Sequence, residues 1–322
     1  MKQWGRWRKR AFVFCVRKIQ RFRRSRAKTG STLPIISVEM LGKDLSPITK
    51  TAALIALAEA LAEHGFVPHV WTRGANYWQT RLLQNPDAPS GLTEDAFILS
   101  QSIPTWVSRQ PDQALRAAED AGATILLLNG PPSKNAVVPH FSIALVSDPS
   151  SKAPLPWYTM SHIDAVVTPR FPDKPLESPP DLTKRGAPPL YFSFWSLEAE
   201  NVSENTPLIG FTGLLNSGVF YQMLLISHYN VKGFIPLSSS NSHKETQWNA
   251  LVKMVQAQNA LLATSQQDYF FLPKKIKLKV HPFSLRLSVD KILVQKILEA
   301  CSGTQPDSAH EVTSSEISSL RA

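Results

Sequence analysis

The sequence alternates apolar runs with alanine- and leucine-rich segments, and this alternation restricts the fold more than any other feature. Segments with the composition of helices lie at 51–63 and 113–122. Nearly continuous apolar runs lie at 34–41, 66–74, 123–129, 141–148 and 163–169. Strands that are apolar along most of their length are typical of parallel sheets covered on both faces. We therefore predict an α/β fold in which a mostly parallel sheet carries helices on both faces.

The second half of the chain predicts a smaller α/β lobe. Its strand-like and helical segments alternate at 207–214, 217–228, 231–236, 244–258 and 260–273. Seven prolines within 168–189 favour a stiff crossing between the two lobes. The predicted divisions are an N-terminal amphipathic helix at 1–30, a first lobe at 31–167, a linker at 168–206, a second lobe at 207–300 and a disordered tail at 301–322.

The N-terminal arm, residues 1–28, accounts for the basic character of the chain. Twelve of the 35 Lys and Arg residues lie in the arm, which contains none of the 25 Asp and Glu residues. The rest of the chain is therefore nearly neutral. Apolar and aromatic residues recur in the arm at steps of three and four, which places them on one face of a predicted helix. They are Trp4, Trp7, Ala11, Phe14, Cys15, Ile19 and Phe22.

The composition of the arm favours a membrane surface as its partner. Its longest uncharged run, 11–16, is too short to cross a bilayer, which takes roughly 20 residues per helix. We interpret the arm as an interfacial helix with its aromatic side chains in the acyl boundary and its arginines on anionic headgroups. A solvated basic tail and a nucleic-acid-binding arm are the alternatives. Aromatic side chains on one face gain little from phosphates alone, so we expect an anionic membrane and no nucleic acid.

A lysine-threonine pair, Lys50-Thr51, opens the helical segment that follows the apolar run at 33–41. Strand, loop, Lys-Thr and helix is the order of a phosphate-binding P-loop, where the lysine reaches the β- and γ-phosphates and the hydroxyl holds Mg²⁺. The intervening loop has only one glycine, Gly42, and Pro47 has no N–H to offer a phosphate. The pair by itself is equally compatible with an ordinary helix start that carries a solvated lysine.

The order of the remaining segments makes the motif more specific. After the basic arm and the strand come SPITKT at 46–51, an alanine- and leucine-rich helix, TRG at 72–74 and TEDA at 93–96. They are followed by HFSIALVSD at 140–148, HIDAVVTP at 162–169, LIGFTGLLNSGVFYQML at 208–224 and TSQQDYFFLP at 264–273. In order and spacing, residues 1–290 resemble the tetraacyldisaccharide 4'-kinases, the P-loop family that phosphorylates the lipid A precursor. The resemblance implies a P-loop NTPase-like sheet.

The departures from the family pattern fall on the segments that carry chemistry. The family's Gly-Gly-Thr-Gly-Lys-Thr loop is SPITKT here, and its Phe-Pro-Asp-His-His segment is IPLSS at 235–239. Its Asp-Asp-Gly at the end of the central strand is Leu128-Asn129-Gly130. Mg²⁺ requires hard oxygen ligands, which leucine lacks and a neutral asparagine supplies poorly. Phosphoryl transfer depends on positioning and on cancelling charge, and these losses weaken both.

The resemblance still implies a set of site residues. The cofactors would be ATP and Mg²⁺, and the substrate a glycolipid. Glu94 and Asp95 could equally be solvated acids at a helix start, and Arg73 could face water. The implied roles are ATP binding by Thr49, Lys50, Thr51 and Arg73, Mg²⁺ binding by Thr51, and catalysis by the carboxylates of Glu94 and Asp95.

Two functional hypotheses follow from the sequence. The first is an ATP-dependent kinase that phosphorylates a glycolipid disaccharide at the cytoplasmic face of the inner membrane, as a peripheral protein. The second is a catalytically inactive, degenerate paralogue that binds lipid or nucleotide or regulates a true kinase. Lys50-Thr51 and Glu94-Asp95 favour the first hypothesis, and Leu128-Asn129 favours the second. The sequence leaves open whether the chain is an enzyme.

Overall fold

A computed structural model gives the structure of the protein. It describes residues 33–41, 45, 47–74, 80–83, 92–130, 137–146, 162–173, 188–212, 217–236, 244–272 and 274–302. The basic arm and residues 303–322 of the predicted tail lie outside these ranges, so both remain predictions. Within the described residues, no helix combines the length and the apolar character needed to cross a membrane.

The first part of the chain builds a largely parallel sheet. Its strands are β1 (Ile35–Met40), β2 (Pro68–Arg73), β3 (Arg81–Leu83), β4 (Thr105–Ser108), β5 (Ile125–Asn129), β6 (Phe141–Leu145), β7 (Ala165–Arg170) and β8 (Leu190–Ala199). They lie side by side in the order β8-β7-β6-β1-β5-β2-β4-β3, and only β3 runs antiparallel to its neighbour. The prediction of a mostly parallel sheet is confirmed.

Helix α2 (Pro47–Glu63) shows how the local sequence produces this architecture. Alanine, leucine and glutamate are strong helix formers and dominate it. Pro47 occupies the first position, where its missing N–H costs no helical hydrogen bond. Gly65 ends the helix with φ +83°, and the N–H groups of Gly65 and Phe66 donate to the carbonyls of Ala62 and Leu61. This Schellman arrangement turns the chain back toward β2.

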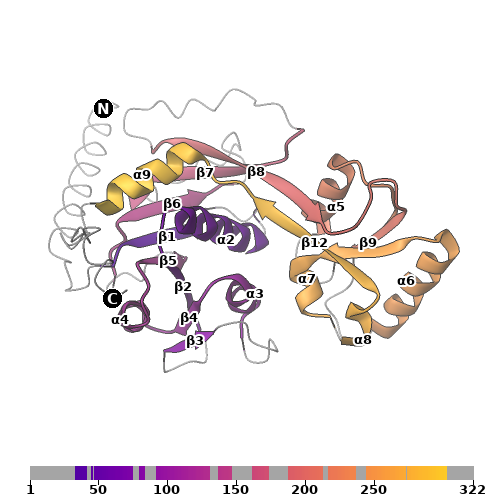
Figure 1. Cartoon of the computed structure of the whole chain (residues 1–322), viewed down its shortest axis with the longest axis horizontal. Helices are drawn as coiled ribbons and strands as arrows, with labels where there is room; N and C mark the ends of the chain where they lie inside the picture. Colours follow the sequence, from indigo (N-terminus) through magenta and orange to yellow (C-terminus); the bar gives the residue numbers. More distant parts are fainter. Residues whose placement is uncertain are drawn as a thin grey trace, which may run out of the picture.

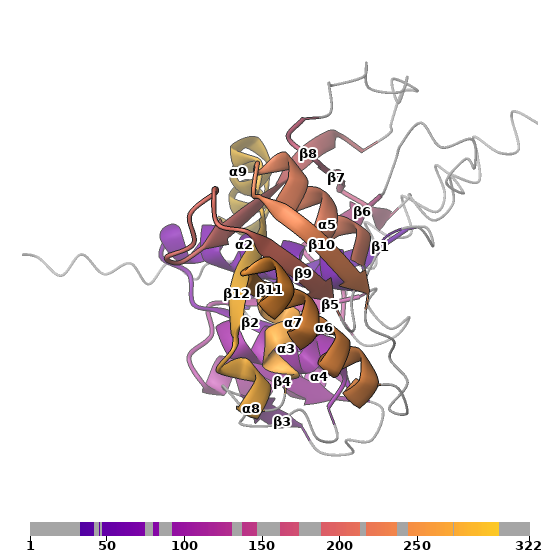
Figure 2. The ribbon, with the colours of Figure 1, turned by 90° about the vertical axis from the view of Figure 1, so that its right-hand side faces the viewer.

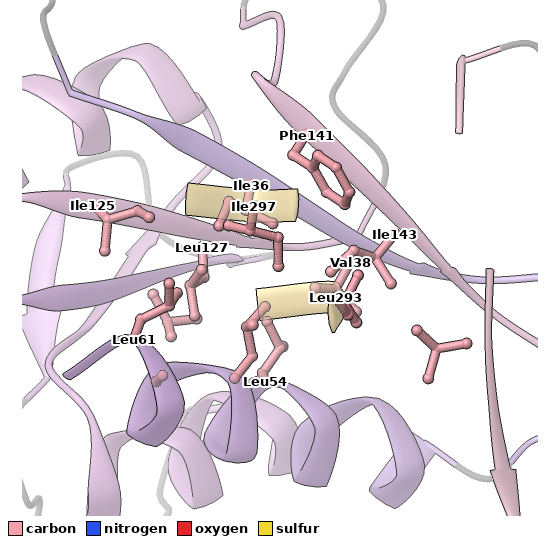
Figure 3. Packing of buried hydrophobic residues seen from close by; sticks show 14 of the residues in the cluster. Ile36, Val38, Leu54, Leu61, Ile125, Leu127, Phe141, Ile143, Leu293 and Ile297 are labelled. Carbon is pink, nitrogen blue, oxygen red and sulfur yellow. The ribbon is translucent and has the colours of Figure 1, made fainter. Parts of the chain in front are cut away.

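Helices cover both faces of the first-lobe sheet. On one face, α2 and the C-terminal helix α9 (Lys291–Ser302) pack against β1, β5 and β6. Figure 3 shows Leu54 and Leu61 of α2 close to Leu293 and Ile297 of α9, all buried beneath the sheet. On the other face, α4 (Pro111–Asp120) covers the strands with Leu115 and its neighbouring alanines. The predicted two-sided covering is therefore present.

The second lobe repeats the layered arrangement around four more strands. These are β9 (Leu208–Thr212), β10 (Val231–Pro236), β11 (Leu261–Ser265) and β12 (Val280–Leu287), which are parallel to one another. Helix α5 (Ser217–Ile226) packs on one face through Phe220 and Leu224, and α6 (Lys244–Gln258) packs on the other through Leu251. In Figure 2 the second lobe faces the viewer, with α5 and α6 beside β9 and β10.

Two elements depart from the predicted divisions. The range 168–206, expected as a linker, contains the ten-residue strand β8, which pairs with β7 on one side and antiparallel with β12 on the other. The range 207–300, expected as the second lobe, contains most of α9, whose apolar side chains pack in the first-lobe core. Figure 1 shows β8 and β12 running between the two groups of helices. Residues 301 and 302, expected in the tail, complete α9.

Candidate functional site

The start of α2 meets the start of α3 (Glu94–Ser102) through three of the predicted site residues. Nζ of Lys50 lies 3.5 Å from Oδ2 of Asp95, and the side chains are 16% and 23% exposed. The hydroxyl of Thr51 donates to Oδ1 of the same carboxylate over 3.4 Å. The N-termini of α2 and α3 therefore meet at one lysine, one hydroxyl and one carboxylate. Thr51 and Asp95 are 44 residues apart in the sequence.

The first turn of α2 replaces part of the expected loop. The helix begins at Pro47, so Thr49 to Thr51 all have helical backbone. The side chain of Thr49 is buried, at 2% exposure, rather than directed to the Lys50–Asp95 pair. Ile48 packs against Trp195 of β8 and Met223 of α5, which ties the helix start to the second lobe. Lys50 and Thr51 consequently occupy the first two turns, at the positively polarised end of the helix dipole.

The carboxyl groups at the start of α3 are held by a helix cap. The hydroxyl of Thr93 accepts from the backbone N–H of Ala96 at 3.3 Å, which fixes Glu94 and Asp95 in the first turn. Acidic residues are stabilised there by the helix dipole. The pKa of Glu94 is raised above its usual value, chiefly because the carboxyl is partly removed from water and further by the negative charges of Asp95 and Asp268.

Asp268 comes from the second lobe and was not among the predicted site residues. It is buried at 2% exposure in the short helix α7 (Gln266–Phe270). The hydroxyl of Ser265 donates to its Oδ2 at 2.8 Å, and its backbone N–H donates to Ser265 Oγ at 3.1 Å. Ser265 is therefore the N-cap of α7, which the Ser-Gln-Gln-Asp pattern in the sequence could have indicated. Figure 1 shows α7 beside α3 at the junction of the lobes.

The carboxyl end of β5 is neutral and buried. Leu128 is fully buried against the α4 face of the sheet. Asn129 donates from Nδ2 to Oγ1 of Thr72 on β2 at 3.1 Å. Its Oδ1 atom is buried and has no hydrogen-bond partner in the described part of the chain. Gly130 follows with φ +125°, so the chain leaves the strand by a turn that only glycine adopts without strain.

Arg73 lies at the same edge of the sheet but apart from the helix starts. It is the last residue of β2, its side chain is exposed, and it forms no ion pair with another described residue. The structure therefore brings together Lys50, Thr51 and Asp95, with Glu94 next to them, and does not bring Thr49 or Arg73 into that contact. The described residues contain no group of three His, Cys, Asp or Glu side chains arranged to hold a metal ion.

Comparisons with known proteins show which sequences and structures the chain resembles. No protein-family model matches the sequence. A tetraacyldisaccharide 4'-kinase from Methylobacterium nodulans is 25% identical over 306 residues, which cover 88% of this chain and 89% of that protein. A crystal structure of LpxK from Aquifex aeolicus in complex with ATP superposes with a TM-score of 0.63 at 16% identity, over 90% of this chain and 97% of that one. Over most of its length the chain is similar to a tetraacyldisaccharide 4'-kinase, as the order of its segments predicted.

The likeness to this solved structure gives the fold its class. The superposition over nearly the whole length of both chains shows a P-loop NTPase-like sheet with an additional lobe. In such sheets ligands bind outside the carboxyl ends of the strands, next to the helix that follows the first strand. Lys50, Thr51 and Asp95 lie at the start of that helix and of α3. The family assignment made from segment order is confirmed, and the roles of the individual residues are developed below as proposals.

Proposed function

We propose that this protein is an ATP-dependent kinase that phosphorylates a hydroxyl of a glycolipid disaccharide. The Methylobacterium nodulans relative is named for a kinase reaction on a tetraacyldisaccharide. The observation that carries the proposal is the convergence of Lys50, Thr51 and Asp95 at two helix N-termini. Because the same contact joins a cation, a hydroxyl and a carboxylate, it offers the groups that phosphoryl transfer requires.

ATP would bind with its phosphates at the start of α2. The first backbone N–H groups of a helix lack partners inside the helix and attract anions, although Pro47 contributes none. Lys50 would leave Asp95 to reach the β- and γ-phosphates. A partly exposed ion pair is worth only about 0.2–1 kcal/mol. Contacts with the multiply charged triphosphate chain would therefore exceed what Lys50 loses when it releases Asp95.

Glu94 is the carboxylate best suited to act as general base. Asp95 is already occupied by Lys50 and Thr51, whereas Glu94 is exposed and its pKa is raised. A raised pKa makes a carboxylate a stronger base near neutral pH. In the transfer, the sugar oxygen bonds to the γ-phosphorus and the bond from that phosphorus to the β–γ bridging oxygen breaks. The hydroxyl proton passes to Glu94, and ADP leaves.

The residues present fit a magnesium ion held together with nucleotide. Mg²⁺ in kinase sites usually keeps several waters and takes one or two carboxylates together with substrate phosphates. Thr51 and Asp95 would hold it, and the buried Oδ1 of Asn129 has its lone pairs unused by the described residues. When bound, the ion would neutralise negative charge on the phosphates. Arg73, and Thr49 through its backbone N–H in the first turn of α2, would make further contacts with ATP.

We place the protein at the cytoplasmic face of the inner membrane as a peripheral protein. The support is the sequence of residues 1–28, whose cationic and aromatic residues suit an anionic bilayer surface. A lipid substrate would then be met in the plane of the membrane. Flotation of the full chain with vesicles containing anionic lipid would test this; binding to DNA with a steep salt dependence, but not to vesicles, would contradict it.

The inactive-paralogue hypothesis finds no support in the comparisons. Its remaining basis is the replacement of carboxylates at Leu128-Asn129. The deciding experiment offers purified full-length protein ATP, Mg²⁺ and a tetraacylated disaccharide in detergent micelles. We expect the lipid to gain the mass of one phosphate, and Lys50→Ala to abolish most of the product. Equal product from the wild type and from Lys50→Ala, or none from either, would contradict the kinase proposal.

A further inference from the structure

A small cavity lies where α2, α3, α7 and β12 meet. Its volume is about 120 Å³. Its lining mixes apolar side chains, such as Ile98, Phe270 and Leu285, with polar ones, such as Gln267, Ser284 and Arg286. We propose that this cavity binds the sugar ring of the acceptor, an assignment that rests on the proposed kinase function.

The strongest evidence is a buried amide with an unused acceptor. The side chain of Gln267 is 7% exposed, and its Oε1 has no hydrogen-bond partner among the described residues. Its Nε2 reaches the carbonyl of Leu285 only at 3.5 Å, the outer limit of a hydrogen bond. Leaving a buried polar atom unpaired costs about 1–3 kcal/mol. Oε1 itself exposes almost no surface, so the amide must turn toward the cavity before a ligand that donates an O–H or N–H can pair with it and remove this cost.

The cavity is larger than the space that one ordered water requires. One water requires roughly 10–15 Å³ of such space. The cavity exceeds this requirement about tenfold, so it has room for a group much larger than a single water. A lining of both apolar and polar side chains suits a sugar ring, which presents C–H faces and hydroxyl edges.

The rim supplies charged and hydroxyl groups at the outer edge of the cavity. Arg286 lies between two carboxylates, with Nη1 at 3.8 Å from Glu59 and Nε at 3.6 Å from Glu198. Both pairs are about half exposed, so the guanidinium can exchange partners at little cost. Ser284 donates to Oε1 of Gln266 at 2.6 Å, which leaves the amide nitrogen of Gln266 available to the cavity.

The position of the cavity relates it to the transfer site. Gln267 is the immediate neighbour of Asp268, whose charge acts on Glu94, and the lining residue Ala52 follows Thr51. A second hollow of about 540 Å³, bounded by α2 and α9, shares Ala56, Glu59 and Leu287 with the first. The lining of the small cavity thus includes the sequence neighbours of Thr51 and Asp268, and the larger hollow leaves room for the rest of a disaccharide.

The test replaces Gln267 by methionine, which keeps the length of the side chain and removes its polar atoms. We expect KM for the glycolipid to rise roughly 3- to 10-fold, the loss of one hydrogen bond of about 0.5–1.5 kcal/mol. KM for ATP should stay unchanged, and the melting temperature should stay constant or rise because an unsatisfied group is removed. Gln222→Met, on the exposed face of α5, is the matched control and should change none of these values.

The outcomes separate this proposal from the kinase proposal. If the wild type is active and Gln267→Met leaves KM for the glycolipid unchanged, the cavity does not bind the sugar. If the wild type is inactive, calorimetry with the deacylated disaccharide decides. Binding that is weakened by Gln267→Met but not by Gln222→Met supports the cavity without catalysis. Absence of binding to the wild type overturns it.

Discussion

The α2–α3 corner and the end of β5 lie at the same edge of the sheet but have opposite character. At the corner, Lys50 and Asp95 carry complementary charges and stay partly exposed. At the end of β5, Leu128 is buried in the core and Asn129 is neutral, with one hydrogen bond to Thr72. The charged groups thus sit on helix starts and the strand end has become part of the hydrophobic interior. The proposed phosphate site therefore depends on the helices more than on the sheet.

The largest effect should come from removing the cation of the corner. We expect Lys50→Ala to lower kcat/KM roughly 10³-fold, because it removes charge that would stabilise the transferring phosphoryl group. The measurement is lipid phosphorylation at saturating Mg²⁺. Lys253→Ala, an exposed lysine on α6, is the control and should retain full activity. A loss below about tenfold would show that the corner does not dominate the site.

Removing the proposed base should have the next largest effect. Glu94→Gln keeps the size and the helix-start position but cannot accept the hydroxyl proton. We expect kcat to fall about 10²-fold, at the low end of general base effects because the transition state of phosphoryl transfer is loose. ATP binding, measured by calorimetry, should remain. Full activity in this variant would assign the proton to another group.

Restoring a negative charge at the end of β5 should lower the Mg²⁺ requirement. In Asn129→Asp, a carboxylate replaces the unpaired amide oxygen, and the Thr72 hydroxyl can rotate to donate to it. We expect the Mg²⁺ concentration for half-maximal activity to fall by up to about tenfold, equivalent to 1.4 kcal/mol. Asn129→Ala should give no such gain. An unchanged Mg²⁺ requirement in Asn129→Asp would mean that β5 does not face the metal.

The smallest expected effect is on pH dependence. Negative charge on Asp268 contributes to the raised pKa of Glu94. Asp268→Asn removes that charge while its side-chain oxygen can still accept from Ser265. Glu94 should then lose its proton at lower pH, so the acidic limb of the kcat/KM profile should move to lower pH. A shift toward higher pH, or none, would contradict the coupling between the two carboxyls.

The local sequence predicted the bounds of several helices and strands well. Helix α6 and strand β10 have the predicted bounds, and α2 begins four residues before the predicted Thr51. The missed elements depend on partners distant in the chain. Strand β8 follows a proline-rich stretch and pairs through Phe283–Ala199 with β12, which itself contains Pro282. Pro282 disfavours β12, whereas the aromatic residues of β8 favour a strand. The sequence does not show which distant strand pairs with either of them.

The sequence predicted only part of the candidate site, because the rest depends on contacts between residues that are distant in the chain. Lys50, Thr51, Glu94 and Asp95 stand out because they occupy helix starts after strands. Nothing in the sequence states that Asp95 contacts Lys50, or that Asp268 from the second lobe approaches Glu94. These relations arise from tertiary packing. Gln267 gave no signal at all, because an unpaired buried amide is recognisable only once its surroundings are known.

The chain enters the second lobe by β8 and leaves it by β12, and these strands are paired in antiparallel register. The two boundaries of that lobe are therefore neighbours in space, and α9 afterwards completes the core that α2 began. This is the topology of a domain inserted into a host, in which evolution can lengthen, exchange or remodel the guest while the host keeps both of its ends. Variation in acceptor preference among relatives is accordingly expected to concentrate between residues 200 and 280.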